Sequence, residues 1–260
     1  MVKLKCFWKL AFIANLKWQM CLYDAKEDKY VSGDIHAKGS WEGPMVEKMI
    51  NVMRKYKNST LLDIGGNIGF YTLAAAAAGF SVNVFEPVPA NAAMIQQSIQ
   101  KNNFTNIRLH TSALGAHVGE LGMGIDKNNQ GGVRHIGTST TMLPTFRLDG
   151  ALNFETRPVY IKIDIEGGEC NALEGMQNYI SKSTNITGVN MEFGQSRTKC
   201  CSQWTLPGGF FDILYNKHNL CPSPHPYDGI CSIRAWDLVW VPCSTLKKRH
   251  NSFYRRHVQI

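Results

Sequence analysis

Four carboxylate side chains stand at or next to the ends of short apolar runs in this 260-residue sequence, and they are the first sign of chemistry. They are Asp63, Glu86, Asp164 and Glu192. Such runs are typical of buried strands, and the carboxyl ends of parallel strands meet at the edge of a sheet where ligands bind. A charge at an otherwise apolar edge costs free energy unless it is solvated or binds something. The four acids together therefore predict a ligand site.

A glycine-rich turn follows the first of these acids. Gly65, Asn67 and Gly69 succeed Asp63 at every second position. This spacing fits neither the G-x-G-x-x-G fingerprint nor a phosphate loop. The helix expected to start near Gly69 would point its N-terminus at the turn, which favours a carboxylate on the ligand. Asp63 can accept hydrogen bonds from the turn or bind a ligand ammonium, and the alternative for the motif is a plain tight turn.

Glu86 lies 23 residues after Asp63, at the end of the next apolar run. An acid at this place can accept hydrogen bonds from both hydroxyls of a ribose. Combined with the turn, it predicts a nucleoside that carries a carboxylate and an amine but no pyrophosphate. S-adenosylmethionine fits this description. The alternative for Glu86 is a solvated charge at a strand end.

From residue 60 onward, short apolar runs alternate with segments of helical periodicity. The alternation predicts right-handed β-α-β units, and hence an α/β fold with a mostly parallel sheet. Residues 115–157 interrupt it with recurring glycines, and we interpret them as a hairpin or an irregular insertion. The expected strands are residues 60–64, 81–86, 107–110, 159–164, 186–193 and 236–241, and the expected helices are residues 70–78, 89–100, 170–180 and 210–216.

Three sequence motifs follow one another along the chain: LLDIGGNIGFYT at 61–72, VFEP at 84–87 and IKIDIEGGE at 161–169. The first marks a class I methyltransferase. With the third, the chain resembles the FkbM-type family of S-adenosylmethionine-dependent methyltransferases, from about Gly39 to Phe193. The resemblance implies a Rossmann-like class I methyltransferase fold, with a seven-stranded, mostly parallel sheet, an antiparallel last strand and helices on both faces. It also implies that S-adenosylmethionine is the cofactor.

The resemblance implies roles for individual residues as well. Many methyltransferases have an acid beside the adenine where this chain has Ser112, so the sequence departs from the pattern there. Trp41 and Glu42 match an element that could close over cofactor and substrate, and the alternative for Trp41 is packing in an N-terminal helix. The implied cofactor contacts are Asp63, Gly65, Asn67 and Gly69 at the methionine end, Glu86 at the ribose, and Ser112 and Ala113 beside the adenine.

Asp164 is the predicted general base, with Glu192 as the second candidate. A base that takes the proton of an acceptor hydroxyl contributes about 10²–10⁴-fold, while attack of the acceptor oxygen on the methyl carbon, in line with the departing sulfur, needs alignment of the reactants. Glu166 is a candidate substrate contact. Alternatively, its charge stabilises the N-terminus of the following helix, as the charge of Glu169 does. Lys162 is expected to pair with neighbouring acids. Asp164 and Glu192 could instead hold a divalent metal, but with two ligands no metal is predicted.

The sequence thus predicts an enzyme that methylates a hydroxyl on a sugar, glycan or other metabolite. Known members of the family mostly methylate oxygen on sugars, polyketides or related compounds. One alternative is N-methylation of a protein or small amine, although the motif Asn/Asp-Pro-Pro-Tyr is absent. The other alternative is a binding module that has lost catalysis. The acceptor itself is not readable from the sequence.

The net charge of +8 is concentrated at the two ends of the chain. Residues 1–20 and 245–260 hold nine basic residues and no acid, and the remainder holds 19 basic against 20 acidic residues. No nucleic-acid groove is therefore expected, whereas the basic ends could touch a membrane surface weakly. No transmembrane helix is expected, and the oligomeric state is unknown. The expected division is a basic, helical extension and lid (1–45), a methyltransferase domain (46–243) and a basic tail (244–260).

The eight cysteines leave two alternatives open. They are either buried free thiols, or they form one or two disulfides in an oxidising compartment. No C-x-x-C pair occurs, so a zinc site is not expected. A cytoplasmic location is favoured, while the cysteines, three glycosylation sequons and a weak signal-peptide pattern leave a lumenal or secretory one open. The sequons begin at Asn58, Asn103 and Asn185, and the cysteines of the last quarter are Cys200, Cys201, Cys221, Cys231 and Cys243.

Overall fold

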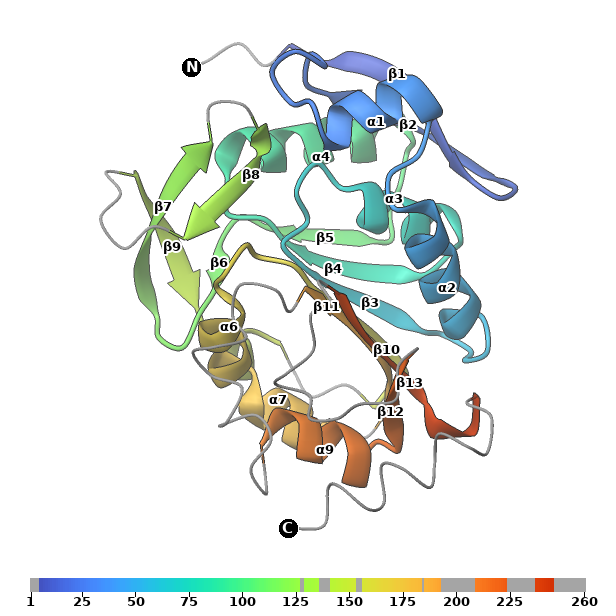
Figure 1. The fold of residues 1–260 in the computed structure, drawn as a ribbon, viewed down its shortest axis with the longest axis vertical. Helices are drawn as coiled ribbons and strands as arrows, with labels where there is room; N and C mark the ends of the chain where they lie inside the picture. The colour runs from blue at the N-terminus through green and yellow to red at the C-terminus, as the bar shows by residue number, and fades with distance from the viewer. Residues whose placement is uncertain are drawn as a thin grey trace.

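A seven-stranded sheet forms the centre of the molecule (Figure 1). The computed structural model describes residues 5–126, 129–135, 141–152, 156–183, 185–192, 209–223 and 237–245. The strands lie in the order β12 (Leu220–Ser223), β13 (Asp237–Pro242), β11 (Ile186–Glu192), β10 (Val159–Ile163), β3 (Thr60–Ile64), β4 (Ser81–Phe85) and β5 (Ile107–His110).

Five neighbouring strands of this sheet, from β11 to β5, are parallel. Strand β13 runs antiparallel to β11. Every residue of β3 and β10 is buried, because helices cover both faces of the sheet. The predicted Rossmann-like class I methyltransferase fold is confirmed, including the antiparallel last strand. Strand β12, which pairs with β13, was not predicted.

Helices cover the two faces in two groups (Figure 1), and each group has its own hydrophobic core. The fully buried Met49 and Leu73 belong to one core, and Leu173 and Leu214 belong to the other. In the described ranges, no helix is both long and apolar enough to cross a bilayer. The first group is α2 (Gly43–Met53), α3 (Phe70–Ala77) and α4 (Pro89–Lys101), and the second is α6 (Glu169–Gly175), α7 (Gln177–Lys182) and α9 (Phe210–Asn216).

The N-terminal segment, expected to be a basic, helical extension and lid, begins with a β-hairpin that was not predicted, and helices follow it. Strands β1 (Phe7–Ile13) and β2 (Leu16–Leu22) pair antiparallel, and α1 (Val31–Lys38) leads on to α2. Apolar residues alternate with period two along β2, and one face of the hairpin is buried against α3 and α4. The boundaries proposed at residues 45 and 243 stay predictions, and of the basic tail only residues 244 and 245 lie within the described ranges.

The interpretation of residues 115–157 as a hairpin is confirmed, within a second, four-stranded sheet. Its strands lie in the order β6 (Ala113–Leu114), β9 (Thr141–Phe146), β7 (Gly119–Asp126) and β8 (Asn129–His135). The single helix predicted over 170–180 is instead two helices, α6 and α7, which meet at Met176. A Cβ on Gly175 would lie 2.0 Å from the Gly115 carbonyl oxygen, so the helix ends where it crosses the start of the second sheet.

Disulfides join the described cysteines. Cys6 pairs with Cys21 across the N-terminal hairpin, and Cys221 pairs with Cys243 beside β12 and β13. Cys170 is disulfide-bonded as well. Within the described ranges no cysteine is free, so the disulfide alternative is confirmed there and the free-thiol alternative is wrong. Three cysteines lie outside the described residues: Cys200, Cys201 and Cys231.

We expect the Cys221–Cys243 disulfide to stabilise the sheet edge measurably. The two cysteines are 22 residues apart, and closing a loop of this size lowers the entropy of the unfolded chain by the equivalent of roughly 3 kcal/mol. The double substitution Cys221→Ser/Cys243→Ser should lower the free energy of unfolding by about that amount in a denaturant titration without reductant. The difference should shrink when reductant is added to both proteins. Equal free energies in the absence of reductant would contradict the pairing.

Candidate active site

The turn after β3 brings the candidates Gly65, Asn67 and Gly69 together. All three have positive φ angles, of 84°, 51° and 92°. The side-chain oxygen of Asn67 accepts a hydrogen bond of 2.7 Å from the Ile68 amide, a local bond that suits asparagine in this conformation. A Cβ on Gly65 would lie 1.9 Å from the carbonyl oxygen of Asp164. Glycine is therefore required where the turn packs against the end of β10.

The Asp63 carboxylate is fully buried beneath this turn. Thr72 Oγ1 donates a hydrogen bond of 2.6 Å to Asp63 Oδ2, and Lys162 Nζ lies 3.7 Å from Oδ1. Burial raises the pKa of Asp63, while the Lys162 charge and the Thr72 hydrogen bond oppose the rise. In this arrangement Asp63 joins β3 to α3 and β10, and its contact with a ligand stays a prediction.

Glu86 follows β4, and its buried carboxylate faces the same turn. Its Oε2 accepts a hydrogen bond of 2.7 Å from the Asn67 amide. Its Oε1 accepts one of 2.9 Å from the Val88 amide and one of 3.3 Å from Asn91 Nδ2. Burial raises the pKa of Glu86 to about 7, although these hydrogen bonds favour the charged form. Glu86 is not among the residues that line the neighbouring cavity, and its contact with a ribose stays a prediction.

A cavity of about 210 Å³ lies at the carboxyl ends of β3, β4 and β10 and beside β6. Phe85 forms part of its wall and stacks on His110, with the ring centroids 4.3 Å apart. An apolar cavity next to a buried carboxylate and a glycine turn is what a nucleoside with an amino-acid tail requires, so these residues fit S-adenosylmethionine. The cavity wall includes Gly65, Phe85, Pro87, Ala113, Leu114 and Ile165.

The two predicted adenine contacts, Ser112 and Ala113, differ in their position relative to the cavity. Ala113 lines the cavity, whereas Ser112 is half-buried beside it and does not line it. The sequence analysis missed the contribution of the second sheet and of α6, because no motif or periodicity marked those residues. The polar residues of the wall that were missed are His117, Glu120, Thr145, Asn171 and Glu174.

Lys162 connects the turn to the predicted base. Its ammonium donates a hydrogen bond of 2.6 Å to the Gly65 carbonyl and lies 3.4 Å from Asp164 Oδ2. Burial would lower the pKa of Lys162, but the negative charges of Asp164, Asp63 and Glu42 raise it above its usual range. The side chain therefore stays cationic, and the expectation that it pairs with neighbouring acids is confirmed.

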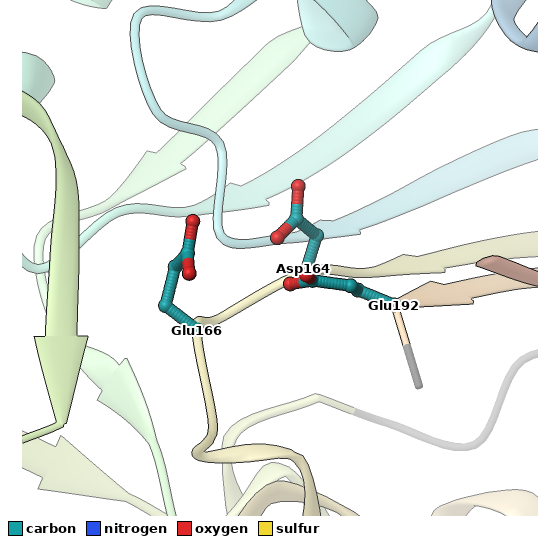
Figure 2. A group of neighbouring side chains, drawn as sticks. All are labelled: Asp164, Glu166 and Glu192. Atoms are coloured by element: carbon teal, nitrogen blue, oxygen red, sulfur yellow. The ribbon is translucent and has the colours of Figure 1, made fainter. Parts of the chain in front are cut away.

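Three carboxylates gather at the ends of β10 and β11 (Figure 2). Asp164, Glu166 and Glu192 each place an oxygen within 4.8 Å of the others. Figure 2 shows the Glu192 side chain reaching from the end of β11 toward Asp164, with Glu166 on the turn after β10. Burial, the Asp164 and Glu166 charges and a hydrogen bond with Asp164 raise the pKa of Glu192 to about 9. These effects favour the protonated form of Glu192 beside the half-exposed Asp164.

Backbone strain marks two of the candidate substrate residues. Glu42 and Glu166 have φ angles of 47° and 53°, a region that glutamate rarely adopts. Tyr71, whose ring lies 5.5 Å from the Lys162 ammonium, donates a hydrogen bond of 2.7 Å from its hydroxyl to Glu42 Oε2. Trp41 is half-buried and packs against the core beneath α2 and α3. The structure thus brings Glu42 close to Lys162, whereas Trp41 packs against the hydrophobic core.

Stability should fall as the pH rises through the range in which Glu192 titrates. The unfolded side chain releases its proton near pH 4.5 and the folded one near pH 9, so between these values a higher pH favours the unfolded state. Glu86 contributes in the same direction only up to about pH 7. From pH 7 to 9, Glu192→Gln should therefore gain melting temperature relative to the wild type. The exposed Glu47→Gln serves as the control, and parallel curves for all three proteins would contradict the raised pKa.

The chain is similar in sequence and in structure to methyltransferases. The family described as the methyltransferase FkbM domain matches residues 63–212, more than half of the chain. No curated protein matches it in sequence.

Three solved structures resemble the chain at low sequence identity. A precorrin-6y C5,15-methyltransferase from Geobacter metallireducens is 12% identical over 71% of this chain and 74% of its own, with a TM-score of 0.42. An rRNA methylase from Streptococcus thermophilus is 10% identical over 77% and 95%, with a TM-score of 0.45. A putative methyltransferase from Streptococcus mutans in complex with SAH is 9% identical over 75% and 94%, with a TM-score of 0.45.

Proposed function

The chain belongs to the FkbM methyltransferase family, whose cofactor is S-adenosylmethionine, and on this premise we propose that it methylates a hydroxyl group of a sugar, glycan or related metabolite. The observation that carries the proposal is the close approach of the Asp164 and Glu192 carboxyl groups at the ends of β10 and β11, with the Asp164 side chain 41% exposed. Such a pair suits the removal of a proton from a neutral acceptor.

When bound, the cofactor would supply an electrophilic methyl group, to which the acceptor oxygen bonds in line with the departing sulfur. In our proposal the turn of Gly65, Asn67 and Gly69 holds its methionine end and Glu86 holds its ribose. Ala113 lies against the adenine, in the cavity that Phe85 also lines. Asp63 supports the turn without touching the cofactor, because it accepts a hydrogen bond from Thr72 of α3 and so fixes the turn relative to that helix. Ser112 contributes through the backbone that positions Ala113.

Asp164 takes the acceptor proton in this mechanism. Its side chain is 41% exposed, so an acceptor can reach it, and Lys162 holds it by an ion pair of 3.4 Å at Oδ2. Glu192 keeps its own proton near neutral pH and directs it to Asp164, which leaves the outer oxygen of Asp164 to accept the hydroxyl proton. A positioned base of this kind contributes about 10²–10⁴-fold to the rate.

The remaining candidates would contact the acceptor. Glu166 lies on the turn directly beside Asp164, and its carboxylate can accept hydrogen bonds from neighbouring hydroxyls of a polyhydroxylated compound. Glu42 approaches the same region from α2 and is held by Tyr71. Trp41 supports Glu42 by packing.

The same three carboxylates provide a specific alternative, in which a divalent cation acidifies the acceptor hydroxyl. The sequence analysis counted Asp164 and Glu192 as ligands, and Glu166 adds a third oxygen within 4.8 Å. A protonated Glu192 cannot ligate a cation, because metal ligands must be deprotonated. The two alternatives therefore differ in their response to a chelator. Activity through the protonated pair survives a chelator, whereas activity through a cation does not.

The proposed function is tested with S-adenosylmethionine that carries a ¹³C-labelled methyl group. The full chain is incubated with a panel of sugars, polyols, phenols, amines and peptides, with and without chelator. We expect transfer to a hydroxyl, which the ¹³C chemical shift identifies as an O-methyl ether, and we expect it to survive the chelator. An N-methyl product would support the amine alternative, and cofactor binding without transfer to any acceptor class would support a binding module.

The disulfides favour an oxidising compartment as the location. Structural disulfides persist in secreted and lumenal proteins and are rare in the cytosol. Two are formed between described cysteines at opposite ends of the chain, and Cys170 takes part in another. We therefore propose the lumenal or secretory alternative in place of the cytoplasmic location.

A further inference from the structure

The N-terminal hairpin presents an apolar face to solvent. Trp8, Leu10 and Phe12 alternate along β1 and are 41%, 44% and 42% exposed. Successive side chains of a strand point to opposite faces, so these three share one face. The opposite face, which includes Ala11 and Ile13, is buried against the body of the protein. Figure 1 shows the hairpin at the edge of the molecule, beyond α3 and α4.

This concentration of exposed apolar side chains is local. Among the described residues, the other large hydrophobic side chains with comparable exposure are Tyr30, Val118 and Met142. They lie in different elements, as scattered surface hydrophobics usually do. Three such side chains in a row on one strand instead form a continuous apolar strip, which is typical of a contact surface. We call Trp8, Leu10 and Phe12 the hairpin strip.

Two lysines lie at the hairpin strip, Lys17 and Lys101, whereas the Lys5 ammonium lies over Phe7 on the opposite face. Residues 5–22 contain three lysines, Lys5, Lys9 and Lys17, and no aspartate or glutamate. Lys17 stands directly opposite Phe12 across the two strands. The Lys101 ammonium, at the end of α4, lies 5.5 Å from the centre of the Trp8 ring. An apolar strip with cations at its rim complements a surface that is apolar within and anionic at its boundary.

The hairpin is also held in place before any partner arrives. The Cys6–Cys21 disulfide joins its strands, and the Gln19 amide donates a hydrogen bond of 2.8 Å to Asn102 Oδ1 on α4. Trp18, on the buried face, packs against Phe70 of α3. Contact through the hairpin strip therefore requires little ordering of the chain, and this preorganisation favours binding.

We propose that the hairpin strip binds the surface of a membrane that contains anionic lipids. Tryptophan and other aromatic side chains favour the boundary between headgroups and acyl chains, and each nearby lysine adds attraction to anionic headgroups. A second copy of the chain would bring lysines against lysines, so charge favours the membrane over self-association. The proposal is independent of the chemistry at the strand ends.

The test is flotation of the full chain with lipid vesicles. We compare vesicles of phosphatidylcholine alone with vesicles that also contain phosphatidylglycerol, at low and high salt. Binding should require phosphatidylglycerol and weaken at high salt. Trp8→Ser/Leu10→Ser/Phe12→Ser should weaken partitioning about a hundredfold, because the exposed part of each side chain contributes roughly fivefold. Lys17→Gln/Lys101→Gln should weaken it about twentyfold, since one lysine contributes roughly fivefold.

The matched control is Tyr30→Ser/Val118→Ser/Met142→Ser, which removes as many exposed hydrophobic side chains from other elements. It should bind vesicles as the wild type does, and unchanged melting temperatures would show that all variants fold. Equal binding by the hairpin and control variants would overturn the proposal. So would absence of vesicle binding by the wild type, or loss of self-association as the only effect of the hairpin variant in sedimentation velocity.

Discussion

Replacing Asp164 with asparagine should lower the turnover number by about a hundredfold or more and leave the affinity for S-adenosylhomocysteine near the wild-type value. Asparagine has nearly the same shape but cannot accept the acceptor proton. The loss should appear in kcat, because Asp164 acts on the reacting hydroxyl and lies outside the part of the site that holds the nucleoside. Turnover is measured with the acceptor found in the labelled-methyl screen, and affinity is measured by calorimetry.

The control for this variant is Asp34→Asn, which removes a carboxylate from a surface ion pair with Lys38 on α1. Surface pairs of this kind contribute little to stability, so Asp34→Asn should match the wild type in both measurements. Glu192→Gln provides a further comparison, because the glutamine keeps a hydrogen-bond donor at the position of the protonated carboxyl. It should retain far more activity than Asp164→Asn. Wild-type turnover by Asp164→Asn would remove this residue from the mechanism.

Replacing Gly65 with alanine should abolish cofactor binding. The added Cβ would lie 1.9 Å from the Asp164 carbonyl oxygen and 2.8 Å from Ile165 Cγ2, and backbone atoms cannot move aside as a flexible side chain can. The turn and the end of β10 must therefore separate. This separation displaces Asp164 and breaks the hydrogen bond between Lys162 and the Gly65 carbonyl. Calorimetry with S-adenosylhomocysteine should show no saturable binding.

Gly79→Ala is the control that distinguishes the effect of this steric clash from the effect of the left-handed backbone conformation alone. Gly79 has a φ of 88°, close to the 84° of Gly65, but nothing lies within 4 Å of the position of its Cβ. We expect a cost of about 1–2 kcal/mol from the left-handed conformation alone, with cofactor binding unchanged. Gly65→Ala should be destabilised further in the same denaturant titration. If both variants bound the cofactor equally and lost the same stability, the close approach of the turn to β10 would be wrong.

The central sheet could be predicted because its strands carry their own signal. Residues 60–64 and 159–163 are apolar runs between turn residues, as strands buried on both faces must be, and the structure places them side by side. The four acids at the ends of the runs followed from the same rule for parallel sheets. Glu86, Asp164 and Glu192 accordingly lie at the ends of β4, β10 and β11.

The cavity wall could not be predicted in full, because it depends on a second sheet. His117 and Glu120 come close to Phe85 only after β6 and β9 pair across about thirty residues, a contact between distant segments that no local periodicity encodes. The raised pKa of Glu192 could not be predicted from the sequence either. It arises from burial and from the approach of Asp164 and Glu166, and neither can be read from the residue type.

The N-terminal hairpin was missed for a different reason. Phe7–Ile13 contains six apolar residues and one lysine, so it shows no alternation, and basic residues near a chain end were interpreted as a solvated, helical extension. Ala14, with a φ of 49°, makes the tight turn to β2. The apolar residues at alternate positions of Leu16–Leu22 were the signal that could have indicated the hairpin. The burial of its inner face would still have required the structure.

The most direct test of this account is a crystal structure of the protein with S-adenosylhomocysteine. We predict that the adenine lies in the cavity beside Phe85 and Ala113, that the ribose hydroxyls reach the Glu86 carboxylate, and that the sulfur faces Asp164. A nucleoside bound anywhere else on the molecule, or one whose sulfur is shielded from Asp164 and Glu192, would contradict it.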